Sequence, residues 1–79
     1  MLTIHLRHFA ALRERRGAER ETLQVEPGTT LRAVYGTLFD PVEHGPLPVA
    51  CLRNRSQVDP DTAVTEGDEI AFLPPFGGG

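Results

Sequence analysis

The sequence predicts an α+β roll in which one main helix covers one face of a mixed sheet. Three observations lead to this fold class. The chain has 79 residues, of which 39% are hydrophobic, enough for one modest core. Strand-like alternation recurs along it, and one long apolar stripe has helical spacing instead. We therefore expect one domain over residues 1–73 and an extended tail over residues 74–79.

The N-terminal half switches between strand and helix patterns. Residues 2–7 place three apolar side chains on one face, which predicts a half-buried strand. From Phe9 the spacing becomes helical, and Gly17 is a suitable stop for a short helix. Residues 22–25 alternate again and precede a Pro-Gly turn, so we predict a second strand there.

The main helix is predicted to begin at Thr29 or Thr30, either of which can cap its N-terminus. An Asp-Pro pair at residues 40–41 should end it, and a proline-rich loop is expected over residues 40–48. Its buried stripe follows an i, i+3, i+4, i+7 pattern that Phe39 extends. The stripe consists of Leu31, Val34, Tyr35 and Leu38.

The C-terminal half contains three further strand candidates. Residues 49–52 are continuously apolar, which predicts a central strand with both faces covered. Residues 57–58 and 70–73 should form the others, with a turn at residues 53–56. Because the main helix covers only one sheet face, we expect the opposite face to be partly open. That face either binds a partner or is simply polar.

Composition limits the classes of function. The net charge of −3 argues against nucleic acid as the main partner. Residues 1–35 hold six Arg and four Glu, giving +2, whereas residues 36–79 hold two Arg and seven acidic residues, giving −5. A single cysteine suits a reducing compartment. No signal peptide or membrane span is evident, so we expect a soluble cytoplasmic protein. The chain has no lysine, which excludes lysine-based catalysis.

The side chains offer no catalytic or metal constellation. Cys51 lies in the most apolar run and is predicted to be a core residue. His5, His8 and His44 lack zinc-ligand spacing, so we expect surface or partly buried histidines and no metal. Turn chemistry explains the acidic residues of the C-terminal half. These residues are Asp59, Asp61, Glu66, Asp68 and Glu69.

The tail is the most unusual segment. Pro74 and Pro75 should form a stiff stalk, and three glycines after Phe76 make a thin tip. Such a segment is either a disordered terminus or an extension that inserts the carboxylate of Gly79 into an active site. Adenylation by ATP would activate that carboxylate, and a sulfur donor could then convert it to a thiocarboxylate.

Two segments resemble the MoaD proteins, the small, sulfur-carrying subunits of molybdopterin synthase. The ending from Glu66 to Gly79, EGDEIAFLPPFGGG, is similar to that family's "dGDEVAFxPPVxGG". Residues 9–14, FAALRE, together with Gly17 resemble its "FAxLRExxG". The Pro-Gly-Thr-Thr-Leu segment at residues 27–31 resembles its helix start. The likeness spans nearly the whole chain.

The resemblance implies a β-grasp, ubiquitin-like fold and a non-catalytic carrier subunit. It implies that an E1-like enzyme, using ATP, adenylates Gly79 and that a sulfur donor completes the thiocarboxylate. Gly78 and Gly79 would enter a MoaE-like large subunit, where sulfur passes to a pterin precursor to build the dithiolene. Two small and two large subunits would form a heterotetramer, and the carrier itself would bind no cofactor.

The resemblance also implies a partner-binding surface on the open sheet face. The matching residues are Phe9, Arg13, Leu73, Pro74, Pro75, Phe76 and Gly77. Two positions depart from the family pattern. Gln57 stands where an apolar residue is common, and Arg53 precedes Asn54 in place of valine.

Three other functions stay open. The chain could carry sulfur for another product, such as thiamine thiazole, cysteine or thiolated tRNA. It could be a ubiquitin-like modifier that forms isopeptide bonds with lysines of other proteins. It could also be an interaction module whose tail is never activated.

Overall fold

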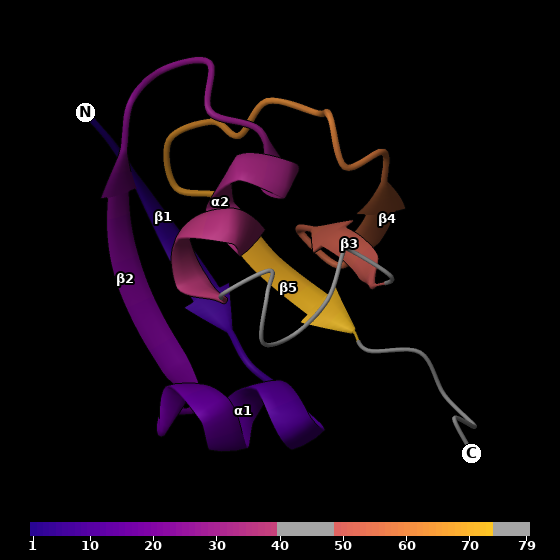
Figure 1. Ribbon diagram of the computed structural model, residues 1–79. Helices are drawn as coiled ribbons and strands as arrows, with labels where there is room; N and C mark the ends of the chain where they lie inside the picture. Colours follow the sequence, from indigo (N-terminus) through magenta and orange to yellow (C-terminus); the bar gives the residue numbers. More distant parts are fainter. Residues whose placement is uncertain (40–48, 74–79) are drawn as a thin grey trace.

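The computed structural model describes residues 1–39 and 49–73 (Figure 1). In these ranges five strands form one mixed sheet, with two helices beside it, which confirms the predicted fold class. The predicted loop at residues 40–48 and the tail at residues 74–79 lie outside the described residues. The elements are β1 (Leu2–Arg7), α1 (Ala10–Arg16), β2 (Arg20–Val25), α2 (Leu31–Leu38), β3 (Ala50–Arg53), β4 (Ser56–Val58) and β5 (Glu69–Leu73).

The strand order is β2-β1-β5-β3-β4, so the last strand of the chain lies in the centre of the sheet. β5 runs parallel to β1 and antiparallel to β3, and the two outer pairs, β2–β1 and β3–β4, are antiparallel. β3 is an interior strand, as predicted for residues 49–52, because it pairs with both β5 and β4. The expectation that both of its faces are covered is wrong: Cys51 is buried, but Leu52 on the other face is only half-buried. A short apolar run does not show whether both faces of a strand are covered.

α2 lies across one face of the sheet and provides the main helical contribution to the core (Figure 1). It begins after Thr30, whose Oγ1 accepts a hydrogen bond from the Ala33 N–H at 3.1 Å, as the capping pattern predicts. The predicted stripe is confirmed, with three of its members buried and Leu38 packed at the edge of the core. Phe39 follows the helix and is also buried, with its ring 4.9 Å from that of Tyr35.

α1 is a short helix at the end of β1, as the spacing predicts (Figure 1). Leu12 is its buried residue. The helix ends at Gly17, whose φ of 71° is the left-handed conformation that favours glycine. The Gly17 N–H donates a hydrogen bond to the Arg13 carbonyl at 2.9 Å.

β3 and β4 are joined by the two-residue turn Asn54–Arg55, within the segment where a turn is predicted. Both residues have positive φ, 51° and 72°, which is the signature of a type I′ hairpin turn. Asparagine tolerates this conformation well, whereas arginine at the second position is strained.

No helix within residues 1–39 and 49–73 is long and apolar enough to cross a membrane.

Candidate functional site

The face of the sheet opposite α2 carries the candidate functional site. Strand alternation turns Ile70 and Phe72 of β5 towards the core, and Ala71 between them towards the opposite face. The strand registers place Ala71 beside Arg7 of β1 and Leu52 of β3. These three residues therefore form a continuous row across the open face of the central strands.

A small cavity of about 170 Å³ lies on this row. Phe9 forms one wall, and the Arg7 guanidinium carbon lies 5.3 Å from the centre of its ring, in cation–π contact. Leu52 and Ala71 supply apolar surface, while the charged residues Arg55 and Glu69 also line the cavity. The result is an apolar hollow with charged groups at its margin, which is suited to a side chain of a protein partner.

The structure brings only part of the predicted partner-binding set together. Phe9 lines the cavity, and Leu73 ends β5 on the same face, opposite Ala50 of β3. Arg13 is exposed on α1 and does not line this cavity. The predicted residues Pro74, Pro75, Phe76, Gly77, Gly78 and Gly79 lie outside the described residues. Sequence reasoning missed Arg7, Leu52 and Ala71, which strand alternation alone could have placed on this face.

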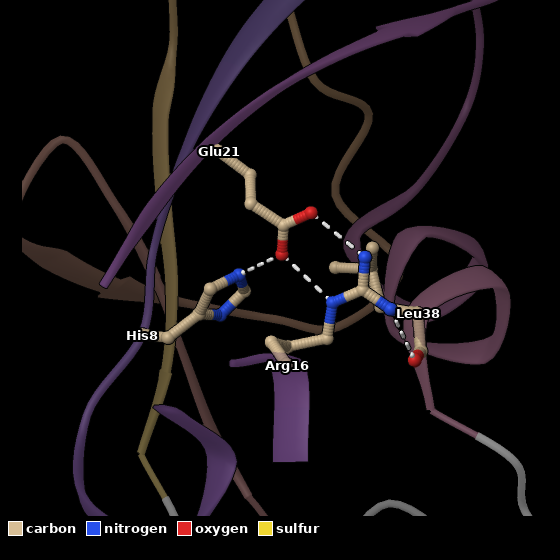
Figure 2. Close-up of polar contacts among 4 residues, drawn as sticks. All are labelled: His8, Arg16, Glu21 and Leu38. Atoms are coloured by element: carbon tan, nitrogen blue, oxygen red, sulfur yellow. Dashed lines mark hydrogen bonds and ion pairs between the residues drawn. The ribbon is translucent and has the colours of Figure 1, made fainter. Parts of the chain in front are cut away.

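A partly buried polar cluster joins the segment just before α1 and the last residue of α1 to β2 (Figure 2). His8 is only 2% exposed, and its Nε2 lies 2.7 Å from Glu21 Oε2. The carboxylate can only accept, so Nε2 carries the proton. The expectation of a surface or partly buried His8 is therefore wrong. The cause is a partner on the neighbouring strand, which makes burial of the imidazole acceptable.

Arg16 completes this His8–Arg16–Glu21 cluster. Its Nε and Nη2 donate to the two oxygens of Glu21, each at 2.7 Å, in a bidentate pair. Its Nη1 donates to the Leu38 carbonyl at 3.3 Å, at the end of α2 (Figure 2). The hydrogen bond from Arg16 is the largest cause that lowers the pKa of Glu21 from 4.5 to about 2, against the opposing effect of burial. Glu21 is thus ionised at neutral pH and ties α1 to β2, while Arg16 ties α1 to the end of α2.

A second polar cluster, Asn54–Thr65–Asp68, fixes the start of β5. The Asp68 carboxylate accepts from the Thr65 N–H at 2.7 Å, from Thr65 Oγ1 at 2.9 Å and from Asn54 Nδ2 at 3.1 Å. Burial raises the pKa of Asp68, but these hydrogen bonds outweigh it and the pKa is lowered. Asn54 Oδ1 in turn accepts from the Glu69 N–H at 2.9 Å. The turn role predicted for Asp68 is confirmed.

Arg53 and Gln57, the two residues that depart from the MoaD sequence pattern, lie on β3 and β4. Arg53 Nε lies 3.1 Å from Asp68 Oδ2, so this arginine adds an ion pair to the second cluster. Gln57 is exposed on β4 and lies opposite Leu52 in the register, which makes that margin of the open face polar.

The remaining candidates for chemistry are structural. Cys51 is 2% exposed, and burial raises the pKa of its thiol, which disfavours the reactive thiolate. This confirms its prediction as a core residue. In the part of the chain that the structure describes, no group of three His, Cys, Asp or Glu side chains is arranged to hold a metal ion. His44 lies outside that part.

Comparison with known proteins assigns this architecture to a family. The model of the ThiS family matches residues 6–79. No functionally curated protein matches the chain in sequence. The chain is similar to the solution structure of the Haloferax volcanii HVO 2177 protein, with 28% identity and a TM-score of 0.82 over 99% of this chain and 87% of the other.

Two further solved structures are similar. One is the small archaeal modifier protein 1 of Methanosarcina acetivorans, with 26% identity and a TM-score of 0.77 over 100% of this chain and 98% of the other. The other is the complex of subunits 1 and 2 of the molybdopterin-converting factor of Helicobacter pylori, with 23% identity and a TM-score of 0.66 over 99% and 100% of the two chains. These likenesses confirm the ubiquitin-like β-grasp fold. The chain therefore belongs to the ThiS family of small ubiquitin-like sulfur carriers.

Proposed function

We propose that this protein is the sulfur-carrier subunit of a molybdopterin synthase, with the carboxylate of Gly79 as its reactive group. The observation that carries the proposal is the family match, which runs through residue 79 and so includes the Pro-Pro-Phe-Gly-Gly-Gly ending. The likeness to a complex of molybdopterin-converting factor subunits supports the choice of product.

The chemistry begins with attack of the Gly79 carboxylate on the α-phosphate of ATP, in the active site of an E1-like enzyme. Pyrophosphate leaves and an acyl adenylate remains. A sulfur donor then displaces AMP and leaves a terminal thiocarboxylate. The folded domain supplies no reacting side chain in this scheme, and the carrier binds no cofactor of its own. Its role is to present the tail to the activating enzyme and then to a large subunit.

Docking of the large subunit would use the open face of the sheet. Phe9, Leu52 and Ala71 offer the apolar surface, and Leu73 leads from the same face towards the tail. The partner would be a MoaE-like subunit in which sulfur passes to the pterin precursor to build the dithiolene. Two carriers and two large subunits would make up the complete synthase.

The test is the intact mass of the protein after incubation with ATP, an E1-like activating enzyme and a sulfur donor. We expect the mass change of one oxygen replaced by sulfur, located by fragmentation at Gly79. A variant with one alanine added after Gly79 is the matched control and should stay unmodified. The activating enzyme must first be shown to modify its cognate carrier protein. If this active enzyme produces no oxygen-to-sulfur exchange on the present protein, the proposal is refuted.

A second candidate function is protein modification, which the likeness to a small archaeal modifier protein favours. The activated Gly79 would then form an isopeptide bond with a lysine of another protein. Because this chain has no lysine, it could not extend such a conjugate through its own side chains. Lysines that carry a Gly-Gly remnant in digests of the host proteome would support this function. Co-purification with a thiazole synthase would instead indicate a thiamine pathway.

A further inference from the structure

Two arginines face each other across the antiparallel pair of β1 and β2, on the open side of the sheet. The register pairs Arg7 directly with Arg20, and alternation turns both side chains away from the core. Like charges in directly opposite positions destabilise a sheet. Among residues 1–39 and 49–73, neither guanidinium has an ion pair with a carboxylate. The register therefore places two arginines opposite each other, and neither has an ion-pair partner among these residues.

Arg7 carries a second irregularity. Its Nε is buried and has no hydrogen-bond partner among the described residues. The guanidinium carbon lies over the Phe9 ring, and this cation–π contact gives the N–H no acceptor. Buried donors are nearly always paired, so the Arg7 side chain retains a hydrogen-bonding capacity that the described residues do not use.

The two arginines line a cavity of about 600 Å³ at this end of the open face. His5 and Thr22 add further hydrogen-bonding groups to its walls. Two acidic residues also border it, and Glu21 is the one with close partners. The Glu21 carboxylate is held by Arg16 and His8, and Glu69 lies 3.7 Å from Arg55.

We propose that this cavity, the Arg7–Arg20 pocket, binds an acidic side chain of the protein that docks on the open face. The planar guanidinium fork matches a carboxylate, and Arg7 is partly exposed and Arg20 exposed at the cavity. Arg7 also lines the smaller apolar cavity, so the pocket is continuous with the proposed docking surface. The proposal rests on the proposed function only for the identity of that partner, not for the chemistry of the pocket.

The first experiment tests the pocket without any partner. Amide chemical shifts are followed by NMR while the protein is titrated with N-acetylglutamate. We expect changes centred on Arg7 and Arg20, with affinity lowered at least about tenfold in Arg7→Gln and in Arg20→Gln. Arg32→Gln is the matched control, because Arg32 is an exposed arginine paired with Asp61 on another surface. Its affinity should equal that of the wild type.

Parallel titrations with inorganic phosphate and AMP separate the two possible sources of an anion. Tighter binding of AMP than of N-acetylglutamate at the same arginines would assign the pocket to a nucleotide and overturn the proposal. Equal loss of affinity in Arg32→Gln would also overturn it, because the effect would then reflect net charge alone.

The second experiment measures binding of the MoaE-like large subunit at two salt concentrations. Arg7→Gln and Arg20→Gln should each weaken the complex about tenfold and reduce its salt dependence, whereas Arg32→Gln should not. Unchanged binding would show that the partner places no carboxylate here. Thiocarboxylate formation is measured on the same variants. Its failure in the wild type would refute the proposed function, while the N-acetylglutamate titration would still test the pocket.

Discussion

The two faces of the sheet use the same strands for different purposes. On the covered face, Ile4, Ile70 and Phe72 are at most 1% exposed and pack beneath α2. On the open face of the same strands, Arg7 and Glu69 are partly exposed and line cavities. Stability and recognition are therefore carried by alternating residues of one strand. Because the two sets point in opposite directions, substitutions should separate them.

The largest expected effect comes from the covered face. Phe72→Ala removes a ring that lies 5.2 Å from that of Tyr35, in edge-to-face contact. We expect a loss of about 3–5 kcal/mol in the free energy of unfolding, measured by urea denaturation. This is a large share of the total stability of a small domain. A loss below about 1 kcal/mol would contradict the packing described here.

The next largest effect is a pH dependence of stability that arises from the His8–Arg16–Glu21 cluster. The pKa of Glu21 is lowered from 4.5 to about 2 in the folded state, so its contribution is complete above about pH 4.5 and is lost as the pH falls through about 2. Glu21→Gln should remove up to about 3 kcal/mol at neutral pH and less at low pH. Urea denaturation from pH 7 to 2 measures this difference. A difference independent of pH would contradict the ionised cluster.

A substitution on the open face should lower the affinity for the large subunit more than it lowers the stability of the protein. Leu52→Ala removes a half-buried side chain opposite Ala71, and we expect a stability loss of only about 1 kcal/mol. Binding of the large subunit should weaken by about tenfold or more, because Leu52 lines the apolar cavity. Denaturation and calorimetric binding measure the two quantities on one sample. A large loss of stability with unchanged binding would invert the assignment of the two faces.

The smallest effect is a gain. Arg55 holds a φ of 72° at the second position of the type I′ turn, where glycine is preferred. Arg55→Gly should stabilise the protein by about 0.5–1 kcal/mol. The lost contact with Glu69 matters little, because the Arg55 side chain is 83% exposed. Thermal unfolding checks the direction of the change, and Arg55→Ala, which keeps the strain, should show no gain.

Local sequence patterns were sufficient to predict the secondary structure and most of the core. Alternation identified β1 and β5, helical spacing with Thr30 and Gly17 identified the two helices, and the position of Phe39 at the end of the apolar stripe indicated its burial. These are local properties, because each depends on residues within about one or two helical turns. The unusual composition of the tail likewise belongs to the sequence, and the functional hypothesis for Gly79 began there.

The strand neighbours could be identified from the tertiary structure alone. The central place of β5 depends on parallel pairing with β1, between residues more than sixty positions apart. The burial of His8 depends on Glu21 of the next strand, and the facing arginines depend on the β1–β2 register. Periodicity assigns a residue to a face but not its partner across the sheet, because pairing is set by the packing of the whole chain.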